Sequence, residues 1–306
     1  MNLFHKKDQY KGYNIYSMKK YVDKKRIIFT TIIVILIIIT LGFIIYYSID
    51  TTIRLANAKR FEQKLIEYES NQEELQKQEK ERQAKIPKLT DEGKQNIKGI
   101  YKSETKRVFL TFDDGPSVNT ADVLDILKSN DIKATFFVLG TQVEKMPEMV
   151  KRAYQEGHYI ANHGYSHQYS QIYSSPETVL QEFNQCNSAV AKAIDVPEYN
   201  SHLFRFPGGS VGGKYANLKA EAVTLLEQNN IMHVDWNALT GDAEKSSPDE
   251  EYLMNNLQKT TQNKNSIVIL MHDAQAKRVT VEFLPKLIEF FQQQGYQFEN
   301  FYSIIK

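Results

Sequence analysis

Arg107-Val-Phe-Leu-Thr-Phe-Asp-Asp-Gly-Pro116 is the stretch that indicates the fold of this chain, because it joins a strand, two carboxylates and a turn. A short apolar run rich in strand-forming residues ends at Asp113 and Asp114, and a Gly-Pro pair follows at once. Adjacent negative charges repel, and burying either is costly unless a cation or a hydrogen-bond donor compensates it. The pair suggests that one carboxylate holds a metal ion while the other handles a proton. Taken alone, the stretch fits a plain surface turn equally well.

The residues after Lys106 alternate between strand-like and helix-like runs, which predicts βα units around a parallel sheet. Six or seven such units in about 200 residues favour a closed or nearly closed (β/α) barrel. A doubly wound open sheet is the alternative. The predicted strands are 108–112, 134–139, 159–162, 203–206, 231–235 and 267–272. The predicted helices are 120–129, 141–156, 176–194, 218–229, 248–262 and 280–294.

Residues with reactive side chains follow the carboxyl ends of these strands, where β/α barrels build their active sites. They are Asp113 and Asp114 after the first predicted strand, His163 after the third, Arg205 near the end of the fourth, Asp235 at the end of the fifth and His272 at the end of the sixth. We therefore expect these side chains to meet at one end of the barrel.

His163 and His167 have the i, i+4 spacing that lets two imidazoles chelate one ion on a helical turn, although two unrelated loop histidines would look the same. Adding Asp114 gives three protein ligands, which leaves coordination positions open as a catalytic metal requires. Cys186 is the only cysteine, so a disulfide within the chain and a zinc site of cysteines are excluded.

Three further motifs are weaker signals, and each also fits a structural role. Arg205 begins Arg-Phe-Pro-Gly-Gly, in which a guanidinium can keep a carboxylate ionised and glycine N–H groups can approach an oxyanion. Asp235 could orient a histidine, while Trp236 could form a wall of a small apolar pocket. His272 ends a buried-looking strand and could serve as a general acid.

Together these motifs resemble the polysaccharide deacetylase family, also called the NodB-homology domain or carbohydrate esterase family 4. The resemblance covers about residues 106–303 and is highly specific, because five blocks match in order. The blocks are Thr-Phe-Asp-Asp-Gly-Pro at 111–116, His-x-x-x-His at 163–167, Arg-x-Pro-x-Gly at 205–209, Asp-Trp at 235–236 and Leu-x-His at 270–272.

The resemblance implies a deformed (β/α) barrel with about seven strands, fewer than eight, and a role for each matching residue. Asp113 would be the general base, steadied by Arg205, and His272 would be the general acid, oriented by Asp235. A divalent ion, usually Zn²⁺ with Co²⁺, Mn²⁺ or Ni²⁺ as alternatives, would be held by Asp114, His163 and His167. Substrate would contact Gly208, Trp236 and Leu270, the last two lining a pocket for the acetyl methyl group. Many family members have tyrosine where this chain has Gly208.

An uncharged apolar run at residues 27–49 is long enough to cross a bilayer. It exceeds a signal-peptide core and lacks a small-residue cleavage site, so we expect a retained transmembrane helix. Residues 1–26 carry eight Lys and Arg against two Asp, which predicts a cytoplasmic arm and places the following residues outside the cell. Residues 50–86 read as a helical stalk with too few apolar positions for more than weak self-association. Residues 87–105 read as a linker and residues 106–306 as the catalytic domain.

The expected function is removal of N-acetyl groups from N-acetylglucosamine residues of a cell-wall glycan, with release of acetate. Peptidoglycan is the leading substrate because the anchor holds the domain beside it, and a secondary wall polysaccharide is the next. The anchor and the basic arm fit a Gram-positive bacterium. The net charge of +1 gives no reason to expect nucleic acid as a partner. The alternatives are an O-acetyl polysaccharide esterase and a non-catalytic, membrane-tethered glycan-binding protein.

Overall fold

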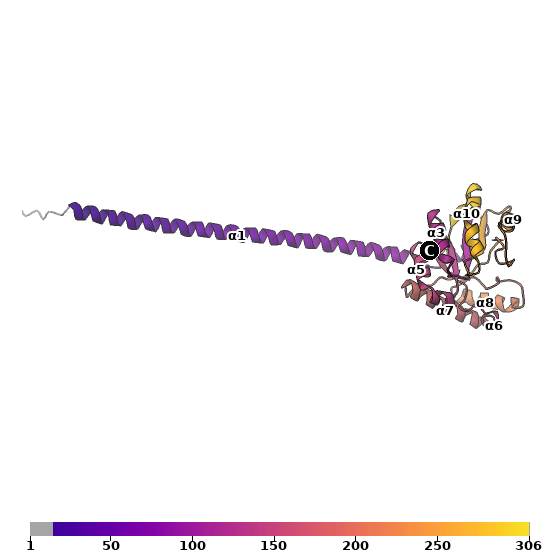
Figure 1. Cartoon of the computed structure of the whole chain (residues 1–306). Coiled ribbons are helices and arrows are strands. Elements are labelled where there is room, and N and C mark those ends of the chain that lie inside the picture. The colour runs from indigo at the N-terminus through magenta and orange to yellow at the C-terminus, as the bar shows by residue number, and fades with distance from the viewer. Residues whose placement is uncertain (1–14, 306) are drawn as a thin grey trace, which may run out of the picture. The chain divides into compact units, whose positions relative to one another are not determined.

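The computed structural model describes residues 15–305, which divide into two units at residues 78 and 79. Residues 1–14 of the predicted cytoplasmic arm lie outside the described part of the chain. The first unit contains most of α1 (Ile15–Ala84), a single helix of 70 residues that Figure 1 draws without a break. Its most apolar window has a mean hydropathy of 3.1 with none of that window buried, so α1 is long and apolar enough to cross a membrane.

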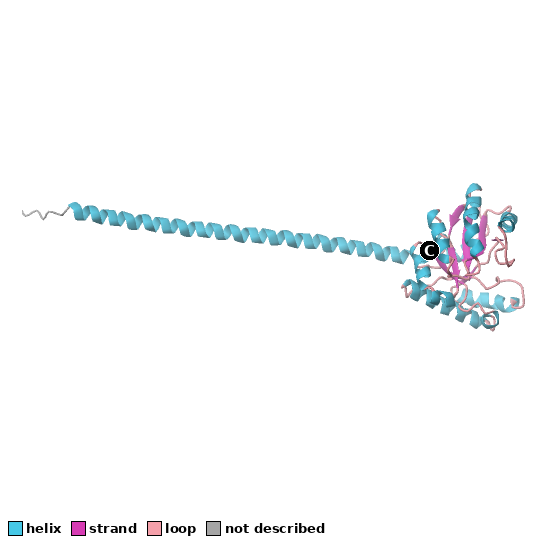
Figure 2. Cartoon of the chain, viewed as in Figure 1, coloured by secondary structure: helices cyan, strands magenta, loops and turns pink. Residues whose placement is uncertain are grey.

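The second unit is an α/β domain in which helices cover the outside of one curled sheet (Figure 2). Its strands are β1 (Arg107–Asp113), β2 (Thr135–Val138), β3 (Tyr159–Asn162), β4 (Leu203–Phe204), β5 (Met232–His233), β6 (Ala238–Leu239), β7 (Ser266–His272) and β8 (Gln297–Glu299). Its helices are α2 (Asp91–Lys98), α3 (Thr120–Ser129), α4 (Gly140–Lys145), α5 (Pro147–Gln155), α6 (Tyr169–Ile172), α7 (Pro176–Ile194), α8 (Ala216–Gln228), α9 (Glu250–Thr261) and α10 (Arg278–Gln293), followed by the short 3₁₀ helix η1 (Phe301–Ser303).

All strand pairs in this sheet are parallel, and the strand order is β5-β4-β3-β2-β1-β7-β6, with β8 joined to the start of β1. Within residues 15–305 the two edge strands, β5 and β6, do not pair with each other. The sheet is therefore a curled half-barrel of seven strands in its main path, which confirms the predicted deformed barrel and excludes full closure.

The alternation of β1 decides which side chains enter the barrel, because successive residues of a strand point to opposite faces. Val108, Leu110 and Phe112 belong to the core between the sheet and the outer helices. Phe109 belongs to the inner core instead. Asp113 is two strand periods from Phe109 and therefore lies on the inner face, at the carboxyl end of the barrel.

Three local expectations differ from the structure. The predicted helix 141–156 is two helices, α4 and α5, because Pro147 cannot donate the backbone hydrogen bond that would continue the first one. The strands β6 and β8 were not predicted, since each has only two or three residues. Residues 87–105, predicted as a linker, include α2. Ile97 in this helix and Ile100 just after it are buried in the inner core.

Candidate active site

Asp113 and Arg205 form a buried ion pair at the carboxyl end of the barrel. Arg205 is fully buried, and its Nη1 donates to Oδ1 of Asp113 at 2.8 Å and to Oγ1 of Thr111 at 2.7 Å. The guanidinium also lies 3.9 Å from the ring centroid of Phe137. Burial raises the pKa of Asp113, and the charge of Arg205 opposes that rise. The pair fixes the orientation of the carboxylate and leaves its Oδ2 atom free of the arginine.

Asp114, His163 and His167 converge on one point beside this pair. Oδ1 of Asp114 lies 3.5 Å from Nε2 of His163 and 3.4 Å from Nε2 of His167. Each residue offers one ligand atom, and the three atoms lie within 4.8 Å of one another. The loop spacing of the two histidines therefore brings their imidazoles together, as the sequence pattern predicted, although they lie in a turn rather than on a helix.

The donor set fits a divalent transition metal. Oδ1 of Asp114 is buried and has no hydrogen-bond partner among the described residues, which is costly unless a cation compensates it. Burial lowers the pKa of His163 to about 3, so its imidazole is neutral and can act as a ligand. One carboxylate and two imidazoles suit zinc, cobalt or nickel better than calcium or magnesium, which prefer oxygen ligands.

Backbone strain accompanies this cluster. Asp114 has φ of 69° and His167 has φ of 58°, both in the left-handed region that non-glycine residues seldom occupy. Such conformations cost about 1 kcal/mol or more each and persist where the surroundings enforce them, most often at functional sites. These backbone conformations direct the side chains of Asp114 and His167 toward the point that they share with His163.

Glu182 of α7 holds the histidine loop in place, a role that the sequence motifs did not reveal. Its buried carboxylate accepts hydrogen bonds from the backbone N–H groups of Tyr165 and Ser166 at 2.6 and 2.7 Å, and from Oγ of Ser166 at 2.6 Å. Nδ1 of His163 lies 2.7 Å from the backbone carbonyl oxygen of Arg205, and donation to that carbonyl leaves Nε2 facing the cluster.

His272 ends β7 next to Asp113, its partner in the register of β1 and β7. The residue that orients it is Asp242, whose Oδ1 lies 3.0 Å from Nδ1 of His272 and whose Oδ2 accepts from the backbone N–H of His272 at 2.8 Å. Burial by itself lowers the pKa of His272, but the hydrogen bond to Asp242 and the nearby carboxylates raise it to about 9.

The predicted pairing of Asp235 with His272 is therefore wrong. Asp235 accepts hydrogen bonds from the backbone N–H of Ser210 at 3.0 Å and from its hydroxyl at 2.6 Å. Its backbone carbonyl accepts from Nη2 of Arg205 at 3.3 Å. The side chain thus fixes the Gly-Gly-Ser turn after β4. Asp242 follows the two-residue strand β6 and Gly241, so the strand-end signal that identified the other site residues is too weak to identify it from the sequence.

A cavity of about 330 Å³ is lined by Trp236, Leu270 and Gly208. Asp113, the Asp114–His163–His167 cluster and His272 line the same cavity. Tyr169, from the short helix α6, lines the same cavity. A Cβ atom built on Gly208 would lie 2.6 Å from Oη of Tyr169, and φ of Gly208 is +75°. Tyr169 therefore fills the space that a side chain at position 208 would need.

Asp273 stabilises the turn that follows Asp113 and Asp114. Its Oδ2 accepts from Oγ1 of Thr120 at 2.5 Å, and its backbone carbonyl accepts from the Ser117 hydroxyl. A Cβ atom on Gly115 would collide with this carboxylate, so the turn requires glycine there. Burial raises the pKa of Asp273 to about 7.

Comparison with known proteins identifies the same architecture. A family model described as polysaccharide deacetylase matches residues 101–225. A peptidoglycan-N-acetylglucosamine deacetylase of Bacillus cereus is 33% identical over 205 residues, which cover 65% of this chain and 71% of that protein.

Two solved structures are similar in fold and sequence. A carbohydrate esterase family 4 esterase of Streptococcus mutans aligns with a TM-score of 0.62 and 30% identity, over 67% of this chain and 90% of that one. The catalytic domain of a peptidoglycan N-acetylglucosamine deacetylase from Eubacterium rectale aligns with a TM-score of 0.60 and 31% identity, over 65% and 90%. Both alignments cover nearly all of the solved chain.

Proposed function

This chain belongs to the polysaccharide deacetylase family, and from that premise we propose that it is a divalent-metal-dependent hydrolase of N-acetyl groups on a cell-wall glycan. The observation that carries the proposal is the cavity in which Asp113, the Asp114–His163–His167 cluster and His272 face one another. An amide hydrolase needs a base, an acid and a charge stabiliser around one carbonyl group, and these residues supply that set.

Asp113 acts as the base. Its Oδ1 is held by Arg205, so Oδ2 accepts a proton from the water that adds to the acetamide carbonyl carbon. Thr111 shares the same guanidinium nitrogen, which restricts the arginine and in turn the carboxylate. Asp113 must be ionised to do this, and the fixed charge of Arg205 favours that form.

His272 acts as the acid. With Nδ1 donating to Asp242, Nε2 faces the cavity and gives its proton to the amide nitrogen as the carbon–nitrogen bond breaks. The products are acetate and a glucosamine residue with a free amine. A pKa of about 9 keeps His272 protonated at neutral pH, so the acid is ready before bond cleavage begins.

Asp114, His163 and His167 would hold the divalent ion, with zinc as the leading candidate and cobalt, manganese or nickel as alternatives. A metal ion bound there supplies positive charge that polarises the carbonyl oxygen of the acetamide. Trp236 and Leu270 would receive the acetyl methyl group, and the backbone N–H of Gly208, which also lines the cavity, would be a second donor to the carbonyl oxygen.

N-acetylglucosamine of peptidoglycan is the substrate that we favour, because the Bacillus cereus relative that aligns over 205 residues is a peptidoglycan-N-acetylglucosamine deacetylase. An O-acetyl esterase is the second candidate, since the similar Streptococcus mutans protein is described as an esterase. The same base and acid could serve either bond. A leaving amine needs protonation more than a leaving alcohol does, and the raised pKa of His272 therefore favours the amide.

The apolar part of α1 would anchor the protein as a single transmembrane span, with the basic arm in the cytoplasm and the catalytic domain outside. Protease added to intact, wall-stripped cells should then remove the domain while the arm stays protected. Full protection of the domain, with membrane integrity verified, would contradict this orientation.

The decisive experiment measures the acetate that the full-length protein in detergent releases from two substrates. One is an N-acetylglucosamine oligomer, and the other is a matched oligomer that carries O-acetyl groups but no N-acetyl groups. Mass spectrometry of wall fragments from cells with and without the protein identifies the polymer that gains free amines. Acetate from the O-acetylated oligomers alone would replace the deacetylase assignment by the esterase. Release from neither, with a metal-loaded and folded protein, would leave the glycan-binding alternative.

A further inference from the structure

A groove of about 950 Å³ lies at the opposite end of the sheet from the active site. Lys106 and Asn265, on its rim, come immediately before β1 and β7, whereas Asp113 and His272 are the last residues of those two strands. Strands of seven residues span about 23 Å, so the groove is separate from the catalytic cavity. The remaining rim comes from α9 and the loop after it, and from the end of α10 and the residues that follow it.

The composition of this groove is unlike that of the catalytic cavity. Within residues 15–305, the twelve lining side chains include six carboxamides and three lysines but no Asp or Glu. Five of the carboxamides have no side-chain hydrogen-bond partner among the described residues, and all five are exposed. They are Asn255, Gln258, Gln262, Asn263 and Gln294. The lining has no carboxylate or imidazole, the groups that most often act as general acid or base near neutral pH, and its composition suits binding better than catalysis.

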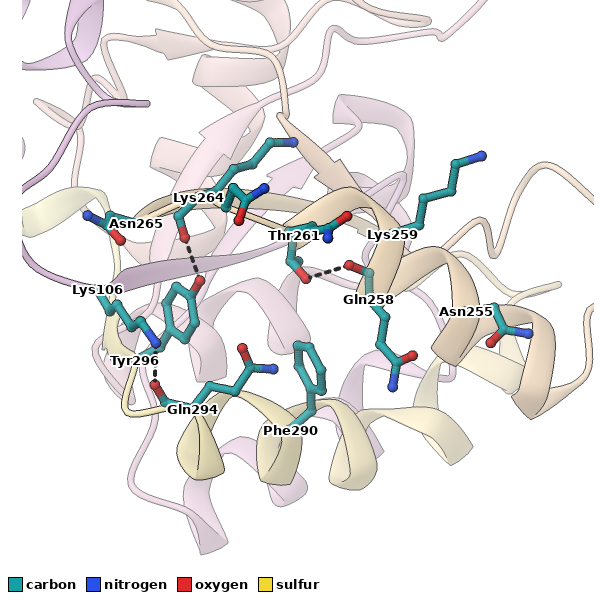
Figure 3. Close-up of a pocket in the computed structure, with 12 residues that line it drawn as sticks. Lys106, Asn255, Gln258, Lys259, Thr261, Lys264, Asn265, Phe290, Gln294 and Tyr296 are labelled. Carbon is teal, nitrogen blue, oxygen red and sulfur yellow. Dashed lines mark hydrogen bonds between the residues drawn. The ribbon is translucent and has the colours of Figure 1, made fainter.

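Two aromatic rings give the groove an apolar floor. Figure 3 shows the ring of Phe290 rising from α10 between Gln294 and Gln258, and Phe290 is only partly buried. Tyr296 is nearly buried, and its hydroxyl donates to the backbone carbonyl of Lys264. Nζ of Lys106 lies 5.4 Å from the Tyr296 ring centroid and donates to the carbonyl oxygen of Gln294 at 3.0 Å, which holds this cation at the groove wall.

The three lysines of the groove differ in how many of their N–H donors already have a hydrogen-bond partner. Lys264 donates to the carbonyl oxygens of Asn237 and Thr260 and is therefore occupied. Lys259 is exposed and has no ion pair among the described residues, and Lys106 keeps donors beyond the one given to Gln294. The groove thus presents two cations that no carboxylate of its lining neutralises.

We propose that this groove is a second glycan-binding site, which holds a hydroxyl-rich polymer carrying anionic groups. Carboxamides can donate to and accept from sugar hydroxyls, and an aromatic face packs against the apolar face of a sugar ring. The two lysines pair with carboxylates or phosphates on the polymer. The polymer class rests on the proposed function, since a wall glycan is what the catalytic end would meet.

Such a site changes activity on insoluble walls without changing the chemistry. A domain held on the polymer at one end meets acetamides at a high effective concentration at the other end. Soluble oligomers do not need this attachment, because they reach the catalytic cavity by diffusion. The two substrates therefore separate the groove from the active site.

The test uses full-length protein in detergent and purified wall sacculi, with bound protein measured by co-sedimentation. The charge variant is Lys106→Glu with Lys259→Glu, and the uncharged variant is Gln258→Ala with Gln294→Ala. Lys151→Glu with Lys192→Glu is the matched control, because both lysines are exposed and lie outside the groove. We expect the charge variant to bind sacculi about 10-fold more weakly and the control to remain within about twofold of wild type. The carboxamide variant should lose about threefold or more.

All variants should keep the wild-type kcat/KM on soluble N-acetylglucosamine oligomers, which verifies an intact catalytic site. Sacculi stripped of phosphate polymers identify the anion: unchanged groove-dependent binding assigns it to peptidoglycan carboxylates, and loss of that dependence assigns it to phosphates. Wild-type sacculus binding by both groove variants would overturn the proposal. Groove-dependent binding by a protein that releases no acetate would instead contradict the proposed function and leave the groove site standing.

Discussion

The two ends of the sheet differ in what they bury. The carboxyl end buries ionisable groups, with Asp113 and Arg205 fully enclosed and Asp242 fixed to His272. The amino end exposes its polar groups, and the side chains around Lys106 and Gln258 lie in a groove open to solvent. Burial shifts the pKa of a charged group and makes a compensating partner necessary, whereas exposed amides and lysines are solvated by water.

This contrast separates chemistry from attachment. At the carboxyl end a single substitution leaves a buried charge or ligand without its partner, so large effects on rate and folding are expected. At the amino end each side chain contributes little and water replaces what is lost.

Removal of the metal should have the largest effect. A strong chelator should abolish acetate release, and zinc or cobalt should restore it. His163→Ala and His167→Ala should each lose the bound ion, measured by elemental analysis, while circular dichroism stays at wild type. Lys106→Ala should retain full metal content. Full activity in a sample verified as metal-free would exclude the metal-dependent mechanism.

Loss of the base should be next in size. Asp113→Asn keeps the shape and removes the proton acceptor, so kcat on a soluble oligomer should fall by about 10² or more with metal content unchanged. His272→Ala should lose a similar factor through leaving-group protonation. Lys259→Ala is the control, and it should keep wild-type kcat on the same oligomer. A rate within about threefold of wild type for Asp113→Asn would remove it from the role of base.

The buried ion pair allows a test by stability. Arg205→Met leaves the Asp113 charge enclosed without its partner, and the free energy of unfolding should fall by about 3–5 kcal/mol. Lys106→Ala, at the exposed end of the same strand, should change it by less than about 0.5 kcal/mol. Chemical denaturation of both variants gives the comparison. Equal stability losses would mean that the buried pair contributes no more than a surface contact does.

The smallest effect distinguishes Asp242 from Asp235. His272 must be protonated to donate, so kcat/KM should fall as pH rises through about 9. Asp242→Asn removes the carboxylate that favours the imidazolium, and the remaining burial lowers the pKa of His272. The alkaline limb should therefore move to lower pH by about one unit or more.

Asp235→Asn serves as the control for this shift, because Asp235 bonds to Ser210 rather than to His272. Its alkaline limb should stay at the wild-type position on the same N-acetylated oligomer. A shift caused by Asp235→Asn and not by Asp242→Asn would restore the assignment that the sequence suggested.

The sequence by itself determined the fold class and most of the site. Alternating apolar runs predicted βα units, and the position of Asp113, Asp114, His163 and His272 at strand ends predicted that they would meet. This works because parallel strands bring their carboxyl ends to one edge, so order along the chain becomes proximity in space. Composition and length likewise identified α1 as able to cross a membrane.

Only the tertiary structure decided which neighbours the site residues have. Asp235 and Asp242 both follow short strands, and adjacency to Trp236 favoured Asp235, yet Asp242 lies against His272 because β6 pairs with β7. Tyr169 in front of Gly208 and Glu182 beneath the histidine loop come from α6 and α7, outside the motifs that the sequence offered. Local sequence carries the period of a strand, but the partner of a buried charge depends on contacts that long loops and helix packing bring together.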